Sequence, residues 1–441
     1  MGRIVSAIIP RSTQGVAMKL KNVSVYTGIG KAPRRSFGVM AKVVGSKCNL
    51  DCQYCYYLEK ENLYEPATSS IMSDEVLEDF IRQYIEASDA PQVTFEWQGG
   101  EPTLLGVDYF ERVLAMQRKH AKGKRISNSL QTNGTLLDDR WAAFLAKNRF
   151  LVGLSLDGPQ DLHDSYRVDK RGRPTFELVM RGWGLLQKHK VETNILAVVN
   201  RKNAEEPLRV YRFFKEIGAE FIQLIPVVER KATQGLLSLA GPPSARRLES
   251  HQQVTDWSVL PEQYGNFLVT IFNEWVREDV GRVFVQLFEI CANVWAKQPA
   301  PLCWFRESCG TALVIEHNGD LYSCDHYVYP EFKLGNIREN GLESLARSKR
   351  QGEFGKEKLD SLPQYCLTCE VRFACNGECP KRRFMLTPDG QPGLNYLCPA
   401  YKQFFNHVDP FMKRIVELIK SGQPAERICQ EAPNSVLAAI E

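Results

Sequence analysis

Three cysteines within eight residues, Cys48, Cys52 and Cys55, constrain this chain more than any other feature. Their spacing, CxxxCxxC, places three thiolates on one short loop, which is enough for three corners of a cubane iron–sulfur cluster. Ferredoxin sequences supply a fourth cysteine, but here the next cysteine is Cys291. One iron would therefore keep an open position, and open positions on metal centres are where substrates bind. The motif indicates an enzyme rather than an electron carrier.

A zinc site is the alternative interpretation of these three cysteines. Structural zinc takes four ligands, often as paired knuckles, whereas this loop offers three thiols and has no histidine close by. A disulfide framework is typical of small secreted chains, but this chain has 441 residues and 13 cysteines, most of them in two zones. The pattern favours iron–sulfur chemistry in a reducing compartment, and we expect the cytoplasm.

Composition excludes several classes of partner. A chain of 441 residues that is 44% hydrophobic can bury a large core and form more than one domain. Its 56 basic and 52 acidic residues nearly balance, which gives no case for a nucleic-acid partner. No apolar run is long enough to span a membrane, and the apolar patch at 1–10 lacks the features of a secretory signal.

From Phe37 onward, strand and helix patterns alternate. The predicted strands are 37–44, 93–97, 127–132, 151–156, 193–199 and 221–228. The predicted helices between them are 73–87, 109–120, 140–147, 176–188 and 204–217. Alternation of this kind favours a parallel sheet, and six units favour a partial (β/α)6 barrel over a doubly wound sheet. The informative residues follow strand ends, the face that carries the site in parallel barrels.

The chain divides into five predicted parts. Residues 1–36 form an extension with one short strand at 23–26, and residues 37–228 form the partial barrel. Residues 229–300 are a polar linker followed by helices, beginning with a helix at 261–276. Residues 301–401 form a cysteine-rich domain. Residues 402–441 contain an amphipathic helix at 404–419 and a tail of about twenty residues.

Residues 99–102, Gly-Gly-Glu-Pro, follow the second predicted strand. Glycines permit close backbone approach, and the glutamate can meet an ammonium group. Gly-Gly alone is common in turns, but its place one strand after the cysteine loop strengthens the signal. The strand ends at 131–134 (Gln-Thr-Asn-Gly) and 155–158 (Ser-Leu-Asp-Gly) could be simple turns, because Asn-Gly and Asp-Gly favour them.

The cysteine loop and the 99–102 motif together resemble the radical S-adenosylmethionine enzymes. The resemblance implies that Cys48, Cys52 and Cys55 hold a [4Fe–4S] cluster whose open iron chelates S-adenosyl-L-methionine. Reductive cleavage of that molecule yields a 5′-deoxyadenosyl radical. The implied contacts to S-adenosyl-L-methionine are Tyr54 and Val228 at the adenine, Gly99, Gly100 and Glu101 at the methionine moiety, and Ser155 and Arg167 at the ribose and carboxylate.

Eight further cysteines lie between residues 303 and 398, enough for two four-cysteine sites. Their spacing alone leaves zinc and iron–sulfur nearly even. After a radical-cluster motif, the pattern resembles the SPASM auxiliary-cluster domain, which implies two more [4Fe–4S] clusters and three in all. The implied sets are Cys303, Cys309, Cys324 and Cys379 for one cluster, and Cys366, Cys369, Cys375 and Cys398 for the other. Cys291 and Cys429 receive no role.

Asp325 directly follows Cys324. An aspartate in such a place is ordinarily a turn or cap residue. Several runs between about 37 and 400, however, resemble the anaerobic sulfatase-maturating enzymes, in which an aspartate after this cysteine is the base. These runs are the Cys-x-Tyr-Cys-Tyr-Tyr loop at 52–57, Trp-Gln-Gly-Gly-Glu-Pro at 97–102, Ser-Leu-Asp-Gly-Pro at 155–159, His-Asp at 163–164, Cys-Asp-His at 324–326 and Gly-Asn-Ile at 335–337.

This resemblance implies oxidation of one Cys or Ser in an unfolded sulfatase segment to Cα-formylglycine. It also implies a low-potential electron donor such as flavodoxin or ferredoxin. Asp325 would be the base, helped if burial raises its pKa. Two alternatives stay open: a SPASM maturase that makes a thioether or carbon–carbon crosslink in a ribosomal peptide, and a non-catalytic zinc-binding interaction protein. The choice between Cys and Ser also stays open.

Overall fold

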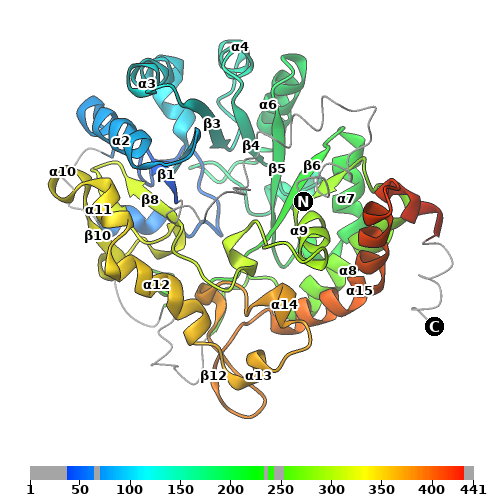
Figure 1. Ribbon diagram of the computed structural model, residues 1–441. Coiled ribbons are helices and arrows are strands. Elements are labelled where there is room, and N and C mark those ends of the chain that lie inside the picture. The colour runs from blue at the N-terminus through cyan, green and yellow to red at the C-terminus, as the bar shows by residue number, and fades with distance from the viewer. Residues whose placement is uncertain (1–36, 64–69, 233–236, 243–252, 432–441) are drawn as a thin grey trace.

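The computed structural model describes residues 37–63, 70–232, 237–242 and 253–431, so the predicted strand at 23–26 lies outside the described residues. Its centre is one ten-stranded sheet with the order β10-β9-β8-β1-β2-β3-β4-β5-β6-β7. Strands β1 to β6 are parallel and adjacent in chain order, and helices cover their outer face (Figure 1). This arc confirms the predicted partial barrel.

The strands of the arc are β1 (Gly38–Lys42), β2 (Gln92–Gln98), β3 (Arg125–Thr132), β4 (Leu151–Ser155), β5 (Thr193–Val199) and β6 (Phe221–Pro226). The helices that cover it are α2 (Asp74–Ala87), α3 (Gly106–His120), α4 (Asp139–Lys147), α6 (Phe176–Lys188) and α7 (Pro207–Glu216). Each of these elements overlaps its predicted range. Ser73 caps α2 by accepting a hydrogen bond from the backbone N–H of Val76, as its sequence position predicts.

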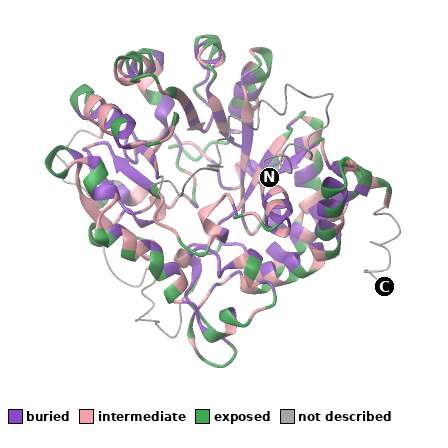
Figure 2. Cartoon of the chain, in the orientation of Figure 1, coloured by how far each residue is buried: buried purple, intermediate pink, exposed green. Residues whose placement is uncertain are grey.

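In strand β2, apolar and polar residues alternate, and this alternation decides which side chains face the helices and which face the inside of the barrel. Val93, Phe95 and Trp97 are buried and point toward the helices, where Trp97 meets Phe110 of α3 edge-on at 6.0 Å between ring centroids. Because side chains alternate along a strand, Glu96 and its neighbours two residues away point into the barrel. Figure 2 shows the same division across the molecule, with buried residues along the strands and exposed ones on the outer helix faces.

Four strands extend the sheet beyond the predicted six. Strand β7 (Phe284–Val285) joins β6 at one edge. At the other edge, β8 (Ala312–Glu316) pairs in parallel with β1, from Gly38 opposite Ala312 to Lys42 opposite Glu316. Strands β9 (Asp320–Tyr322) and β10 (Lys333–Asn336) follow in antiparallel order. The cysteine-rich region therefore continues the barrel sheet rather than standing apart from it.

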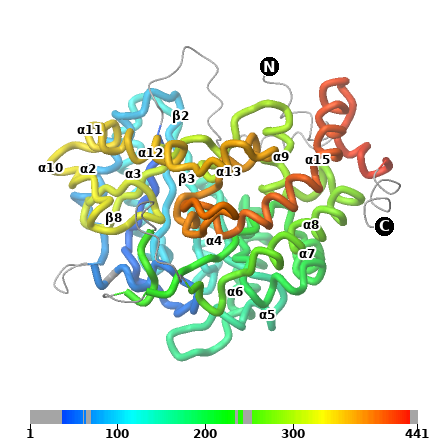
Figure 3. The backbone as a smooth tube through the Cα atoms, turned by 90° about the horizontal axis from the view of Figure 1, so that it is seen from below, coloured from blue at the N-terminus to red at the C-terminus, as the bar shows by residue number. Residues whose placement is uncertain are grey.

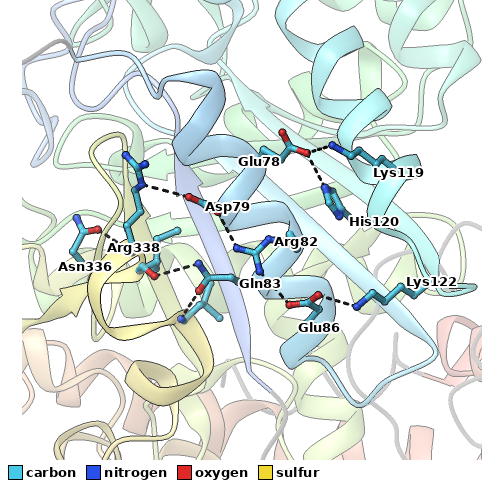
Figure 4. A network of polar contacts seen from close by, with 12 residues as sticks. Glu78, Asp79, Arg82, Gln83, Glu86, Lys119, His120, Lys122, Asn336 and Arg338 are labelled. Carbon is cyan, nitrogen blue, oxygen red and sulfur yellow. Dashed lines mark hydrogen bonds and ion pairs between the residues drawn. The ribbon is translucent and has the colours of Figure 1, made fainter.

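Helix α2 fastens this extension from the outer side (Figure 4). The side chain of Gln83 donates to the carbonyl of Ile337 (3.2 Å) and accepts from the N–H of Leu342 (2.7 Å). These two residues begin α10 (Ile337–Asn340) and α11 (Leu342–Ala346). Arg338 adds an ion pair with Asp79 of α2 at 3.4 Å. One amide thus satisfies two backbone groups of the extension.

Helix α5 (Gln160–Asp164) contacts α6. The remaining helices continue from α7 round to the face opposite α3 and α4 (Figures 1 and 3). They are α8 (Pro261–Glu278), α9 (Gln286–Trp295), α12 (Lys349–Asp360), α13 (Gln364–Leu367), α14 (Arg372–Cys375) and α15 (Cys398–Lys420). The prediction of a tail after α15 is wrong as far as residue 431, because Ala425 and Ile428 are buried and Glu431 pairs with Arg414 at 2.7 Å. None of the helices in the described ranges is long and apolar enough to cross a bilayer.

We predict that Gln83→Leu loosens the extension. The substitution keeps the side-chain size but leaves the Leu342 N–H without its acceptor, which costs about 1–3 kcal/mol if that group stays buried. The Ile337 carbonyl loses one donor and keeps the N–H of Gly341 at 3.2 Å. Hydrogen exchange of peptides covering 337–346 should become faster, while peptides from β4 keep their wild-type rates. Unchanged exchange at 337–346 would show that the bridge does not hold the extension.

Candidate active site

A cavity of about 200 Å³ opens at the carboxyl ends of the barrel strands. Nine of the predicted site residues line it: Cys48, Cys52, Tyr54, Cys55, Gly99, Gly100, Glu101, Ser155 and Arg167. Val228 does not line it and packs into the core, whereas its neighbours Val227 and Glu229 do. The sixth strand ends at Pro226, two residues before the predicted end.

Neighbouring loops hold the cysteine loop in place. The N–H of Asp51 donates to the backbone carbonyl of Val168 (2.8 Å), and the N–H of Gln53 donates to that of Tyr166 (3.0 Å). The loop therefore runs along the segment that carries Arg167. From the other side, the amide of Asn133 donates to the side chain of Asn49 at 2.9 Å. The three thiols therefore have a backbone fixed on both flanks.

The absence of a side chain at Gly100 lets the end of β2 reach this loop. A Cβ built at Gly100 would lie 1.9 Å from the carbonyl oxygen of Lys47. The N–H of Gly100 donates to Gly45 (2.7 Å), and the N–H of Glu101 donates to Lys47 (2.9 Å). The 99–102 motif thus supports the cysteine loop directly, a role that its sequence did not reveal.

Glu101 is 1% exposed and accepts four hydrogen bonds. Its Oε1 accepts from the N–H (3.0 Å) and the hydroxyl (2.6 Å) of Thr103 and from the hydroxyl of Thr132 (2.8 Å). Its Oε2 accepts only from the N–H of Asn133, at 2.7 Å. Burial raises the pKa of Glu101, and these hydrogen bonds oppose the rise. Oε2 is the oxygen that keeps capacity for a cationic ligand.

Asp157, which the sequence indicated as a turn residue, contacts two side chains that line the cavity, Tyr54 and Arg167. It is fully buried, and its carboxylate meets the Arg167 guanidinium at 3.1 Å and accepts from the Tyr54 hydroxyl. It also accepts from the N–H of Val198 (2.9 Å). Burial raises the pKa of Tyr54 well above its usual value, so the hydroxyl remains a donor. The Ser155 hydroxyl faces the cavity and has no hydrogen-bond partner in the described part of the chain.

Asp325 is not among the residues that line the cavity, but the side chains that it contacts are. It begins a short 3₁₀ turn (Asp325–Tyr327) just after β9, and its side chain is 19% exposed. Lys42, at the end of β1, lies 2.6 Å from its Oδ1, and the Tyr56 hydroxyl donates to its Oδ2. Lys42 also donates to Gln98 (2.6 Å). Lys42, Tyr56 and Gln98 all line the cavity.

The expectation that burial would raise the pKa of Asp325 is wrong in its net effect. Burial acts in that direction, but the charge of Lys42, with smaller effects from His326 and from the hydrogen bonds of Lys42 and Tyr56, lowers the pKa to about 2. Asp325 is therefore a carboxylate at neutral pH. The sequence held a clue in Lys42, a charged residue at the end of an otherwise apolar strand.

The later cysteines gather into two groups. In the first group, burial raises the pKa of Cys303, Cys309 and Cys324, and the nearby thiol of Cys379 adds to the rise in each of them. Cys366, Cys369, Cys375 and Cys398 surround a hollow of about 20 Å³ beside Lys402. These are the sets that the family resemblance implied. Cys291 is buried in α9, and Cys429 is partly buried after α15.

None of these groups has the geometry of a single-ion site. Zinc holds sulfur at about 2.3 Å, which brings its ligands to within roughly 4 Å of one another. Among the described residues, one group of three His, Cys, Asp or Glu ligand atoms lies within 4.8 Å, and it is Glu274, Glu278 and Asp279 rather than any cysteines. Lys215 already pairs with that acidic group. The wider grouping of the thiols fits a cluster better than one zinc ion.

Comparison with known proteins agrees with this geometry. Residues 43–214 match the family model described as Radical SAM superfamily, and residues 303–370 match the SPASM model, described as an iron–sulfur cluster-binding domain. A serine-type anaerobic sulfatase-maturating enzyme from Bacteroides thetaiotaomicron is 49% identical over 91% of this chain and 95% of its own length. The chain belongs to the anaerobic sulfatase-maturating enzymes.

A cysteine-type relative and a solved structure also support the assignment to the radical S-adenosylmethionine enzymes. A cysteine-type anaerobic sulfatase-maturating enzyme from Clostridium perfringens is 34% identical over 87% of this chain and 99% of its own length. A solved structure described as "Native anSMEcpe with bound AdoMet and Cp18Cys peptide" superposes with a TM-score of 0.75 at 34% identity, covering 87% of this chain and 99% of that one. Both matches span the barrel and the cysteine-rich region.

We predict that Gly100→Ala displaces the cysteine loop, because its Cβ would overlap the Lys47 carbonyl. The variant, reconstituted without oxygen, should lose one cluster's share of iron and its cleavage of S-adenosyl-L-methionine, while the two other cysteine groups keep theirs. Gly184→Ala in α6 is the matched control, since a Cβ there meets no atom within 4 Å. Full iron content and cleavage in Gly100→Ala would contradict the supporting role of this glycine.

Proposed function

We propose that this protein oxidises one Cys or Ser side chain of a sulfatase polypeptide to Cα-formylglycine. The observation that carries the proposal is the meeting of three thiols, a lysine-paired carboxylate and a polar cavity at one end of the barrel. The named activity of the relatives agrees with it. Residues 37–228 would carry substrate activation, and residues 301–401 the auxiliary clusters.

The residues around the cavity fit the cofactors. Cys48, Cys52 and Cys55 would hold the first [4Fe–4S] cluster, and Oε2 of Glu101 is placed to accept from the ammonium group of S-adenosyl-L-methionine. When bound, this pair supplies a hydrogen-abstracting 5′-deoxyadenosyl radical. The further contacts that we propose to S-adenosyl-L-methionine are Tyr54, Gly99, Gly100, Ser155, Arg167 and Val228. Because the side chain of Val228 does not line the cavity, a side-chain contact at this place would come from Val227.

The two four-cysteine groups would each hold a further [4Fe–4S] cluster. Cys303, Cys309, Cys324 and Cys379 form the group next to Asp325, and Cys366, Cys369, Cys375 and Cys398 form the other. With four protein ligands each, these sites leave no open position for a substrate. Clusters held there would supply a place for the electron that the substrate loses. One cysteine of the first group directly precedes the base, so electron and proton would leave the substrate at one place.

Asp325 is the proposed base for the substrate thiol or hydroxyl. A ground-state thiol, with a pKa of about 8.5, would not yield its proton to a carboxylate. Loss of hydrogen from the adjacent carbon makes the S–H or O–H far more acidic, and an ionised carboxylate is then a sufficient acceptor. Lys42 and Tyr56 keep Asp325 ionised and hold it in place. The base is therefore ready before the radical step.

The competing functions find less support. A maturase of ribosomal peptides would share the cluster ligands, but the relatives described above carry another activity. A zinc-binding interaction module does not agree with the spacing of the thiols. Relatives of both the serine type and the cysteine type match, so both peptides belong in the test. We further propose a flavodoxin or ferredoxin as the electron donor and the cytoplasm as the site of action, since clustered thiols need a reducing compartment.

The function predicts a mass change in a peptide. Anaerobically reconstituted enzyme with dithionite and S-adenosyl-L-methionine should convert a sulfatase peptide of about 17 residues, long enough for an extended groove, to its formylglycine form. The peptide is supplied with Cys or with Ser at the target, and mass spectrometry reads the product. Cleavage of S-adenosyl-L-methionine with neither peptide oxidised would contradict the assignment.

Asp325→Asn should separate the two halves of the reaction. The variant should cleave S-adenosyl-L-methionine at a normal rate but form formylglycine at least about 100-fold more slowly, the usual weight of a general base. Asp360→Asn, at the exposed end of α12, is the matched control and should retain both activities. Normal aldehyde yield from Asp325→Asn would rule out its role as the base.

A further inference from the structure

We propose that His326 donates a hydrogen bond to the side-chain oxygen of a serine target, and so fits the site to serine more closely than to cysteine. The proposal rests on the proposed function and names the substrate residue which that function leaves open. His326 lines the cavity, but neither the cysteine groups nor the Lys42–Asp325 pair uses its imidazole. A donor at this place would contact the reacting group itself.

The neighbour of His326 in the chain fixes the backbone around it. His326 is the middle residue of the 3₁₀ turn Asp325–Tyr327. Tyr327 is buried and packs edge-on against Phe332 and Phe354, with ring centroids 4.8 Å and 5.1 Å away. Because this anchor holds the turn in place, His326 keeps its position at the cavity wall.

The imidazole of His326 has no hydrogen-bond partner among the residues that the structure describes, although its Nδ1 is buried. In this it differs from the other histidines of the described ranges, each of which contacts a side chain. The partners are Glu78 for His120, Thr175 for His163, Asp139 for His189, Glu316 for His317 and Asn273 for His407. An unsatisfied polar atom inside a protein is costly. In a residue that lines the active-site cavity, it indicates a group whose partner is a ligand.

Tyr56 keeps this imidazole next to the proposed base. The rings of Tyr56 and His326 lie 5.4 Å apart between centroids, and the hydroxyl of the same tyrosine donates to Asp325. Lys381 also lies over this ring, 4.5 Å from its centroid, and is already paired with Glu229 at 2.5 Å. A carboxylate acceptor and an imidazole without a partner therefore share one tyrosine as their neighbour.

A serine hydroxyl matches these two groups better than a cysteine thiol does. The hydroxyl offers one donor and two acceptors, so it can donate to Asp325 and accept from His326 at once, whereas a thiol is weak in both roles. An imidazole carries at least one N–H whether it is neutral or charged, and a ring without another partner can adopt the tautomer that its ligand requires. The donor is therefore present in either charge state of His326.

The same hydrogen bond would matter most while the serine is being oxidised. The target –CH2–OH becomes –CHO by losing a hydrogen atom from its carbon, the hydroxyl proton to Asp325 and one electron to an auxiliary cluster. Once the proton has left, the oxygen carries negative charge, and an N–H donor stabilises it as the donors of an oxyanion hole do. A cysteine target undergoes the same losses at sulfur, which is a weak acceptor. Removing the donor should therefore slow serine oxidation far more than cysteine oxidation.

Variants at position 326 separate the N–H donor from the aromatic ring. His326→Phe keeps a ring against Tyr56 but has no N–H. His326→Gln loses the ring but keeps an N–H donor, and His326→Met has a side chain of similar length without one. His189→Phe is the matched control, because this histidine follows α6 at the amino end of the strands, where it pairs with Asp139 at 2.9 Å.

The measurements use anaerobically reconstituted, cluster-loaded enzyme with S-adenosyl-L-methionine and sulfatase peptides of about 17 residues, with Ser, Cys or Ala at the target. Fluorescence anisotropy before reduction gives the Kd of the Ser and Ala peptides. Single-turnover formation of formylglycine after reduction, read by mass spectrometry, compares the Ser and Cys peptides. Iron content and cleavage of S-adenosyl-L-methionine without peptide show that each variant keeps its clusters.

Wild-type enzyme should bind the Ser peptide about threefold to tenfold more tightly than the Ala peptide, as one hydrogen bond typically gives. His326→Phe and His326→Met should lose most of this difference. Both should oxidise the Ser peptide about 100-fold more slowly, while the Cys peptide slows by less than about tenfold. His326→Gln should oxidise the Ser peptide faster than His326→Met does, and His189→Phe should match wild type with both peptides.

The inference is overturned if His326→Phe and His326→Met leave serine oxidation unchanged or slow both peptides by the same factor, or if His326→Gln is no faster than His326→Met. It is also overturned if wild-type enzyme converts the Cys peptide alone, an outcome that leaves the proposed function standing. If no peptide yields formylglycine, the proposed function fails, and binding decides the contact. A Ser–Ala difference that His326→Phe abolishes would then support the contact, and a difference that it keeps would refute it.

Discussion

The parallel pairing of β1 with β8 is the contact on which the rest of the site depends. It joins Gly38–Lys42 to Ala312–Glu316, segments more than 250 residues apart in the chain. One strand leads directly into the cysteine loop, and the other turns through β9 into Cys324 and Asp325. The Tyr57 hydroxyl fastens the same junction by donating to Glu316. Two regions that could have folded separately therefore share one sheet and one cavity.

This junction also decides the charge of the site. Burying a carboxylate is costly unless it is paired or hydrogen-bonded. Asp325 meets that requirement through Lys42, which keeps it ionised, whereas Glu101 meets it through neutral donors and keeps a raised pKa. The Asp157 carboxylate pairs with Arg167.

Local pattern was enough to predict the barrel but not the junction. The six parallel strands and their helices show clear periodicity, and the cysteine spacing identified the chemistry. Strands β7 to β10 have two to five residues each and little periodicity, and their place depends on pairing across the chain. For the same reason the pKa of Asp325 could not be predicted, because Lys42 lies beside it only in the folded sheet. Gly100 was recognised by its motif, but its contact with Lys47 was not.

An iron anomalous difference map from crystals of anaerobically reconstituted protein tests the account most directly. The account predicts three iron clusters: one at Cys48, Cys52 and Cys55 facing the cavity, one at Cys303, Cys309, Cys324 and Cys379 beside Asp325, and one at Cys366, Cys369, Cys375 and Cys398. A single metal ion at any of these groups, or a first cluster bound by a fourth cysteine and closed to the cavity, would contradict it.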